Sequence, residues 1–553
     1  MSLRMQRGYF FAVLGIALPM GLAHGQGSET PVPPSQLDPG QLQQEQRRQL
    51  ERLEEQQRRE RRDTEEAVIE IPEAVTPDTE PDLDFTLQGV RFTESELLED
   101  AALAEVAERY VGRDVTFRDI QRLIEDVNRL YRLEGYITAQ AFLPPQEIRD
   151  GVLTILLVEG RVGQVRIDGN TYVADDYILN RTNVPLGDVL RIDVLQGQLE
   201  RFNAREDIRL SASLAAGEEF GETDVILRAA EPPRTVYQFF VDNSGNESTG
   251  QEQAGVLLSH RGILGSMDRA SFYATYAEGA RFADLSYAFP VNRHGGVMSL
   301  RYSISTTEVV DGPFDDLDLE GKSTTMAVQF DQPWIRTYGF GMDLVARASQ
   351  VDSEGEILGV DYRDQRIRQY DAGLRWEFLE PGYQVTLQPM VGTMRTEDNI
   401  LDDKTGVAVF TGTGTWLQRI SDNFYSVVMG RWQFADQSQS VPPAGEFQVG
   451  GARSVRGYQQ GIASGPHGYH VSGEIHWPGA RWIDPFVFVD HGHVKQVAES
   501  SESITGVGGG FRWQRGRWLS TELTYGHALD NDIIPDQDDY QIHFRITLQG
   551  FRP

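Results

Sequence analysis

Beyond Pro232-Pro233, apolar and polar residues alternate along the chain with a period of two, and glycine, asparagine and aspartate interrupt the runs. In the last run, from Tyr540 to Leu548, every even-numbered residue is apolar and every odd-numbered residue is polar. Successive side chains of a strand point to opposite faces, so each run predicts a strand with one apolar and one polar face. Similar runs occur at residues 298–305, 341–349 and 519–527.

Strands with an apolar outer face, a polar inner face and aromatic residues near their ends are typical of transmembrane β-barrels. A soluble sandwich also alternates, but roughly 320 residues of such strands without a second apolar face would be unusual for one. At about 20 residues per strand and turn, the region holds about 16 strands, a number that leaves an aqueous lumen. We therefore predict a transmembrane β-barrel of about 16 antiparallel strands over residues 233–553.

Residues 85–232 have a different pattern, in which helical periodicity and short strands follow one another. In the segment Phe117–Leu133 the apolar residues lie on one helical face, and Gly135 ends the helix. The pattern predicts two small α/β domains in tandem, over residues 85–160 and 161–232. The predicted elements are a strand at Thr86–Phe92, helices at Glu94–Val111 and Phe117–Leu133 and strands at Tyr136–Leu143 and Val152–Val158 in the first domain, and helices near Asp175–Arg181 and Ile192–Asn203 in the second.

The segment Gln41–Arg62 predicts a helix that is polar on every side. Its 22 residues include seven arginines and five glutamates, and as a helix it would be roughly 33 Å long, close to the thickness of a bilayer's hydrocarbon core. Because it has no apolar face to bury, it is either a solvated helix or a helix inside a polar channel, unless it is a disordered basic tail. Residues 63–84 contain nine acidic residues, three prolines and no basic residue, which predicts a disordered linker that leaves the helix tethered but mobile.

Residues 1–25 have the features of a secretory signal peptide. Arg4 and Arg7 precede an apolar segment from Phe10 to Met20, and Ala23-His24-Gly25 provides a cleavage site with small residues. No later run of about 18 apolar residues exists to form a membrane-spanning helix. The net charge of −32 argues against nucleic acid as a partner, and the absence of cysteine excludes disulfides and thiolate metal sites.

Two short segments late in the chain contain candidate functional residues. Gly450–Tyr458 places an arginine among glycines and apolar residues, which indicates a loop. Phe488, Asp490 and Gly492 share one face of a predicted strand. An arginine on a glycine-hinged loop and a carboxylate inside a β-structure suggest an ion pair, Arg456 with Asp490, that holds the loop in place. The alternative is an ordinary turn with a solvated arginine.

With these parts, the chain resembles the outer-membrane transporters of the two-partner secretion family, the hemolysin or hemagglutinin secretion/activation proteins, which join POTRA domains to a 16-stranded barrel. The resemblance rests on Tyr136–Gln146 and Leu157–Gly160 in the first domain, and on Asp242–Gly245, Thr249-Gly250 and Leu264-Gly265 with Asp268 at the start of the barrel. It also rests on the loop motif Val455, Arg456, Gly457 and Tyr458 and on the barrel-strand motif Phe488, Asp490 and Gly492.

The resemblance implies a function in the bacterial outer membrane, with the POTRA domains in the periplasm. A large unfolded exoprotein, adhesin-like or hemolysin-like, would engage the POTRA domains, where an exposed strand edge can accept an extended chain, and would then pass through the barrel. The polar helix would plug the lumen at rest. Its basic residues are Arg47, Arg48, Arg52, Arg58, Arg59, Arg61 and Arg62.

Other readings of the chain stay open at this point. The two small domains could be spacers. The chain could instead be an assembly factor that inserts other barrels. A diffusion porin is disfavoured, because a porin would need no POTRA domains. As further partners we expect outer-membrane lipids and the barrel assembly machinery, and we expect a monomer.

We expect no metal, cofactor or catalytic site. His491 and His493 lie two residues apart but on the strand face opposite Asp490, with no third donor nearby. The run Gly506–Gly510 predicts a strand of small residues and not a phosphate loop, because no lysine or helix start follows it. Zinc-protease, nucleophile-elbow and P-loop motifs do not occur in the sequence.

Overall fold

The computed structural model describes residues 38–62, 69–70, 84–136, 138–312, 314–337, 339–436, 441–478, 482–496, 501–530 and 538–552, without the side chains of residues 49, 52–62 and 69–70. The signal peptide predicted at residues 1–25 and most of the predicted linker lie outside the described residues. Within the described ranges, no helix is both long and apolar enough to cross a membrane.

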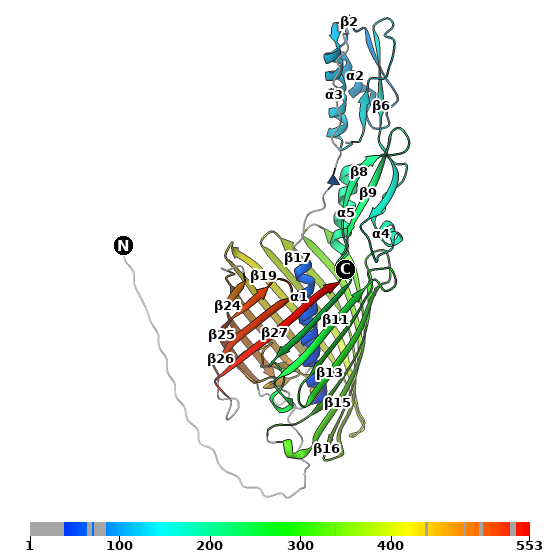
Figure 1. The fold of residues 1–553 in the computed structure, drawn as a ribbon. Coiled ribbons are helices and arrows are strands. Elements are labelled where there is room, and N and C mark those ends of the chain that lie inside the picture. Colours follow the sequence, from blue (N-terminus) through cyan, green and yellow to red (C-terminus); the bar gives the residue numbers. More distant parts are fainter. Residues whose placement is uncertain are drawn as a thin grey trace, which may run out of the picture. The chain divides into compact units, whose positions relative to one another are not determined.

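Sixteen antiparallel strands form a closed barrel (Figure 1), which confirms the fold predicted from the alternation. Each of these strands pairs with the next barrel strand along the chain. The last barrel strand pairs with the first over eight residue pairs, from Thr235–Arg552 to Asp242–Arg545. The strands are β10 (Thr235–Asp242), β11 (Gln253–Arg261), β12 (Arg269–Tyr276), β13 (Ala280–Pro290), β14 (Val297–Glu308), β15 (Leu319–Thr337), β16 (Phe340–Ile357), β17 (Val360–Glu380), β18 (Tyr383–Asp398), β19 (Asp403–Ser421), β20 (Phe424–Ala435), β23 (His467–His476), β24 (Ile483–Lys495), β25 (Ser501–Arg515), β26 (Leu519–Ala528) and β27 (Tyr540–Arg552).

The two faces of the barrel wall differ as the sequence pattern predicts. In β24, Val487 and Val489 are exposed on the outside, whereas Phe488 and Asp490 are buried on the inside. In β27 the exposed side chains from Tyr540 to Phe551 are likewise apolar, among them Ile542 and Leu548. An apolar exterior suits lipid, and the polar interior faces the lumen.

The first small domain packs two helices on a three-stranded sheet of order β3-β6-β5. Its core joins the buried faces of both helices to the inner face of the sheet. Thr116 starts the second helix with a capping box, because its side chain accepts from the Asp119 backbone while Asp119 bonds back to Thr116. The elements are β2 (Asp84–Thr86), β3 (Gly89–Phe92), α2 (Asp100–Glu108), β4 (Asp114–Thr116), α3 (Phe117–Leu133), β5 (Gln140–Phe142) and β6 (Val152–Val158).

Three of the predicted elements in this domain were too long. The helix predicted from Glu94 begins only at Asp100, because Ser95 and Glu159 bind the backbone N–H groups of residues 96–98 in a turn. The strand predicted at Thr86–Phe92 is divided between β2 and β3, since β2 pairs with β4 and β3 pairs with β6. The strand predicted at Tyr136–Leu143 is reduced to β5.

The second small domain has the same arrangement, with an additional strand at the sheet edge. Its sheet has the order β1-β8-β9-β7, and two helices close a separate core. The elements are β7 (Arg161–Asp168), α4 (Asp175–Thr182), α5 (Ile192–Arg205), β8 (Arg209–Ala216) and β9 (Glu222–Ala230).

Strand β1 (Ile69–Glu70) comes from the segment predicted to be a disordered linker, and here that prediction was wrong. It pairs in parallel with β8, Ile69 opposite Ala212 and Glu70 opposite Ser213. The edge of β8 offers unpaired backbone groups, and any adjacent extended segment can pair with them whatever its sequence. Composition alone could not show this contact.

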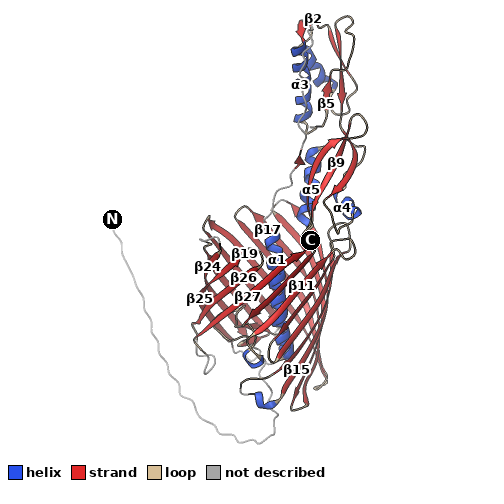
Figure 2. Ribbon diagram, viewed as in Figure 1, coloured by secondary structure: helices blue, strands red, loops and turns tan. Residues whose placement is uncertain are grey.

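The polar helix α1 (Pro39–Arg62) lies inside the barrel, where Figures 1 and 2 show it crossing behind the front strands. Of the two environments that the sequence allowed for a helix, a polar channel is therefore the one observed. The helix begins two residues earlier than predicted. Asp38 accepts a hydrogen bond from the Gln41 backbone at 3.0 Å and so caps it, and Pro39 suits the first helical position.

Closure of the barrel can be tested with cysteine pairs, because the native chain has no cysteine. Gln238 and Gln549 face each other across the β10–β27 seam, and their side-chain amides are 3.1 Å apart. Gln238→Cys with Gln549→Cys should form a disulfide, seen as altered mobility of the unreduced protein in gels. Gln238→Cys with Gln541→Cys, about 27 Å away along β27, is the control and should not. Equal crosslinking of both pairs would contradict the register.

Candidate functional site

The loop between β20 and β23 folds back inside the barrel. It contains a short helical turn, η4 (Pro443–Gly445), and a two-stranded ladder of β21 (Phe447–Val449) and β22 (Ala463–Gly465). Its apolar residues, among them Val455 and Tyr458, form a small core with residues of β24, β25 and β26. The loop is therefore packed against the wall.

Glycines allow the tip of the loop to approach the wall closely. Gly457 has a φ of +100°, and a Cβ there would come within 2.8 Å of the His527 backbone. On the wall, a Cβ at Gly506 would collide with the Arg456 carbonyl, and one at Gly526 would lie 2.6 Å from the Gly457 nitrogen. The glycine-rich run at Gly506–Gly510 thus begins where the loop tip lies, a role that the sequence did not suggest.

Arg456 and Asp490 are joined by three hydrogen bonds. Arg456 donates from Nε to Asp490 Oδ2 at 2.7 Å, from Nη2 to Oδ1 at 2.8 Å, and from its backbone nitrogen to Oδ2 at 3.1 Å. Both side chains are buried. The two-pronged contact fixes the plane of the guanidinium, which a lysine could not do.

Two more residues of the wall complete the contact with Arg456, and sequence reasoning missed both. Glu474 Oε1 accepts from Arg456 Nη1 at 2.6 Å, and Ser472 Oγ accepts from Nη2 at 3.1 Å. Ser472 also donates to Asp490 Oδ1 at 2.6 Å. Both lie on the same face of β23, but the sequence pattern does not distinguish them from the many other polar residues that face the lumen. We call Arg456 with Ser472, Glu474 and Asp490 the loop lock.

The remaining motif residues surround the loop lock. The Phe488 ring lies 3.5 Å from the Arg456 guanidinium carbon, a cation–π contact. Tyr458 donates to the Thr505 carbonyl at 3.0 Å and accepts from the Asp530 backbone nitrogen at 2.9 Å. A Cβ at Gly492 would lie 2.8 Å from Val455, so the glycine makes room for that side chain. All seven predicted motif residues are thus close together.

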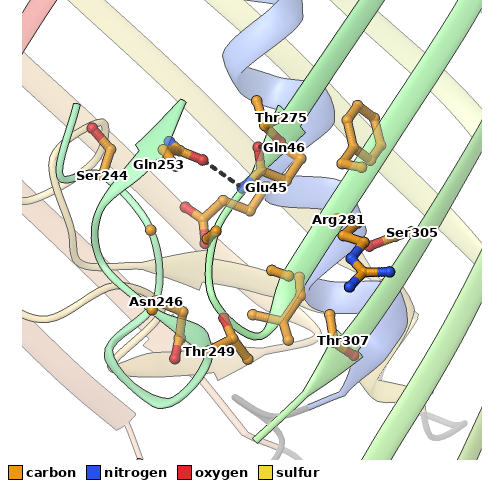
Figure 3. Close-up of a pocket in the computed structure, with 16 residues that line it drawn as sticks. Glu45, Gln46, Ser244, Asn246, Thr249, Gln253, Thr275, Arg281, Ser305 and Thr307 are labelled. Atoms are coloured by element: carbon orange, nitrogen blue, oxygen red, sulfur yellow. Dashed lines mark hydrogen bonds between the residues drawn. The ribbon is translucent and has the colours of Figure 1, made fainter. Parts of the chain in front are cut away.

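Helix α1, which we call the plug helix, is held in the lumen by hydrogen bonds of its glutamines, although the sequence drew attention to its arginines. Gln43 uses its full hydrogen-bonding capacity: its amide donates to the carbonyls of Ser303 and Ser323, and its oxygen accepts from the hydroxyls of Ser323 at 2.7 Å and Thr325 at 2.8 Å. Gln46 bonds to Gln253 and Thr275 beside a cavity between the helix and the first strands (Figure 3).

The arginines of the plug helix have fewer described contacts with the wall. Arg47 lies 4.0 Å from Glu51 on the same helix, and Arg48 donates to Gln44 one turn earlier. The predicted residues Arg52, Arg58, Arg59, Arg61 and Arg62 fall within the helix, but their side chains lie outside the described part of the chain. In the sequence, the repeated glutamines in the first half of the helix could have indicated which side chains contact the wall.

The start of the plug helix is tied both to the wall and to the folded-back loop. Asp38 pairs with Arg363 of β17 at 2.6 Å. Gln41 donates to the Pro443 carbonyl at 2.7 Å and accepts from Gln448, and Gln44 donates to the Ala444 carbonyl. The helix and the loop that carries Arg456 are therefore in direct contact.

Asp268, predicted to mark the first barrel hairpin, holds the turn between β11 and β12. Burial by itself would raise the pKa of this carboxyl. Hydrogen bonds from the hydroxyls of Tyr287 and Ser266 and from the backbone of Leu264 and Ile263 outweigh burial and lower the pKa below its usual value. The carboxylate is thus stabilised as an acceptor for the turn.

The histidines considered as metal ligands lie elsewhere. His491 contacts the Thr505 hydroxyl at 3.1 Å and His493 contacts the Ser503 hydroxyl at 2.8 Å, on the face of β24 opposite Asp490. In the described part of the chain, no group of three or more histidine, aspartate and glutamate residues is arranged to hold a metal ion.

Substitution in the plug helix should separate the role of its glutamines from that of its arginines. Gln43→Ala removes four hydrogen bonds and leaves buried hydroxyls unpaired, so the conducting fraction of channels in planar bilayers should rise about tenfold. Arg47→Gln is the comparison and should change conductance little, because its contact with Glu51 stays within the helix. The reverse order of effects would contradict glutamine anchoring.

Comparisons with known proteins agree with this architecture. The sequence profile described as Haemolysin secretion/activation protein ShlB/FhaC/HecB matches residues 221–513, and that of the ShlB-type POTRA domain matches residues 85–160. The heme/hemopexin transporter protein HuxB of Haemophilus influenzae is 23% identical over 78% of this chain and 81% of its own length. The outer membrane transporter CdiB of Dickeya dadantii is 23% identical over 84% of this chain and 86% of its own.

Solved structures show the same fold. CdiB from Escherichia coli superposes with a TM-score of 0.63 at 19% identity, covering 93% of this chain and 99% of that one. BamA from Haemophilus ducreyi, lacking POTRA domains 1–3, has a TM-score of 0.54 at 13% identity and covers 84% and 100% of the two chains. Because the profile of the secretion/activation proteins spans more than half of the chain, this protein belongs to the haemolysin secretion/activation protein family.

Proposed function

We propose that this protein receives one large unfolded exoprotein at its POTRA domains and passes it through the barrel to the cell surface. The barrel lies in the outer membrane and the POTRA domains lie in the periplasm, as in the family. The observation that supports the proposal most is the polar helix in the lumen, because a closed barrel filled by a removable segment is a gated protein-sized pore.

Recognition at the POTRA domains would use strand addition. Backbone hydrogen bonds are independent of sequence, which suits an unfolded chain of any composition. Strand β8 already accepts β1 along two residues, so its edge is able to pair with an extended segment. Two residue pairs form a weak contact that a longer cargo strand could replace.

The loop lock would have a mechanical role. The guanidinium makes four hydrogen bonds, to Asp490, Glu474 and Ser472, and these hold the loop tip against the wall. Transport of this kind needs neither a catalytic residue nor a cofactor. We further propose that the chain works as a monomer in contact with outer-membrane lipids and is inserted by the barrel assembly machinery.

The competing function, insertion of other barrels, has less support. The likeness to BamA concerns the fold, whereas the matched profile and the relatives HuxB and CdiB are secretion proteins or transporters by description. A plug helix that fills the lumen also serves a pore better than an insertion device.

The lock is tested by substitutions at its centre. Arg456→Ala and Asp490→Ala each leave a buried charge without its partner, at a cost of about 3–5 kcal/mol, and should reduce secretion at least tenfold while the barrel remains in the membrane. Arg456→Lys should also secrete poorly, because an ammonium cannot bind Asp490 at two points. Arg419→Lys, in an exposed pair with Asp422, is the control. Secretion by the lock variants at the level of the native protein would contradict this role.

Strand addition is tested by binding. The N-terminal segment of the cargo exoprotein should bind the detergent-solubilised full-length protein, measured by fluorescence anisotropy. Replacing Ile69 and Glu70 with proline removes the backbone donors of β1 and should tighten binding several-fold, because the β8 edge is freed. Glu105→Gln with Glu108→Gln on α2 serves as the control. Absence of binding to every variant would favour domains that act only as spacers.

A further inference from the structure

The polar contacts of the loop lock continue beyond Glu474 to a histidine that the proposed function does not use. Glu474 gives one carboxylate oxygen to Arg456, and its other oxygen, Oε2, lies 2.9 Å from His476 Nε2. The His476 side chain is completely buried. Glu474 therefore connects the guanidinium of the loop to an imidazole two residues further along β23.

The second ring nitrogen of His476 also faces a carboxylate. Nδ1 lies 3.0 Å from Asp484 Oδ2, and the same oxygen accepts from the Tyr425 hydroxyl at 2.6 Å. A neutral imidazole has one N–H and one lone pair, so it can donate to only one of two carboxylates. With an acceptor at each nitrogen, the ring that satisfies this geometry is the imidazolium.

Aromatic rings on both sides favour the charged ring. The Tyr425 ring lies parallel to His476 with centroids 4.5 Å apart, and the Phe486 ring lies 5.0 Å away. Aromatic faces attract a cation, and the attraction is strongest where water is excluded. The buried His476 ring thus has a carboxylate at each nitrogen and, stacked against it, an aromatic ring from each of two neighbouring strands.

We infer that His476, as the imidazolium, is a positioning residue of the loop lock and makes the lock responsive to proton concentration. The inference rests on the proposed mechanical role of Arg456. The imidazolium holds Glu474 in the orientation in which Oε1 meets Arg456 Nη1. When the ring loses its proton, a lone pair faces one of the two carboxylates, and the carboxylate is repelled.

The charges around His476 give the direction of the effect. Its own strand supplies Glu474, β20 supplies Tyr425, β24 supplies Asp484 and Phe486, and β25 supplies Arg512, which lies 3.7 Å from Glu474 Oε2 and 2.8 Å from Glu522 of β26. With the ring charged, three cations (Arg456, His476 and Arg512) face four carboxylates (Asp490, Glu474, Asp484 and Glu522).

Loss of the proton leaves two cations against the same four carboxylates. Repulsion among the carboxylates then rises, and Glu474 is the one that gives up its place beside Arg456. These groups titrate as a coupled set and not as separate residues. Rising pH should therefore weaken the lock, and falling pH should strengthen it.

The test measures channel opening of the full-length protein in planar bilayers between about pH 6 and pH 9. Open probability of the native protein should rise with pH. In His476→Gln the profile should be flat and the open probability at the low end about tenfold above native, because one charged contact is lost. His491→Gln, on the outer face of β24, is the matched control and should keep the native profile. A native profile in His476→Gln would overturn the inference.

A second variant covers the case in which His476→Gln does not fold, which is checked by heat-modifiable mobility in gels. Asp484→Asn removes one of the two carboxylates that stabilise the imidazolium, so the midpoint of the pH response should move to lower pH. An unchanged midpoint would contradict the inference. His470 also contacts the loop, with Nε2 2.7 Å from the Ser454 carbonyl, so His470→Gln is measured in parallel. Loss of the response in that variant alone would assign it to His470 instead.

Arg456→Ala distinguishes failure of this inference from failure of the proposed function. If His476 acts through the lock, Arg456→Ala should open more often and lose the pH response. A native pH response in Arg456→Ala would show that the histidine acts elsewhere, even if secretion falls. Native secretion by Arg456→Ala would instead contradict the lock itself, whatever the pH profile.

Discussion

Pairing of the last strand with the first is the constraint on which the rest of this structure depends. Within the hydrocarbon core no water is available to backbone groups, so β27 must complete the ladder begun by β10. Closure at sixteen strands leaves a lumen wider than the side chains of the wall can fill. A polar lumen of this width would leave the outer membrane permeable. The barrel therefore requires contents that close it, and we propose that they leave when cargo arrives.

The two segments that fill the lumen are held by different chemistry. The plug helix has a charged contact at its start, the pair of Asp38 with Arg363, but the contacts of Gln43 with the wall are neutral hydrogen bonds, which can be exchanged for bonds to water at modest net cost. Arg456 is bound by charged groups buried from water, a contact that is costly to break one partner at a time. We accordingly propose that the helix is the segment that leaves during transport and that the loop stays in place until its lock is weakened.

The sequence predicted those features whose signal is local. Alternation within each strand predicted the barrel, and the conspicuous arginine and aspartate of two short motifs led to Arg456 and Asp490. It did not lead to Glu474 or His476, because polar residues at lumen positions of β23 look alike until their neighbours are known. The contacts of Gln43 are with residues 260, 280 and 282 positions away, a pairing that no local pattern contains. The shortened helix α2 has the same cause, since Glu159 lies far along the chain from the residues that it holds.

Transport through the lumen requires the plug helix to leave, and this central claim can be measured directly. Gln43→Cys with Thr325→Cys would tether the helix to β15 at a native contact in a chain that has no other cysteine. With the disulfide formed, secretion by cells should stop, and a reductant should restore it, while each single cysteine variant secretes normally. Undiminished secretion by the oxidised double variant would contradict passage of cargo through the space that the helix occupies.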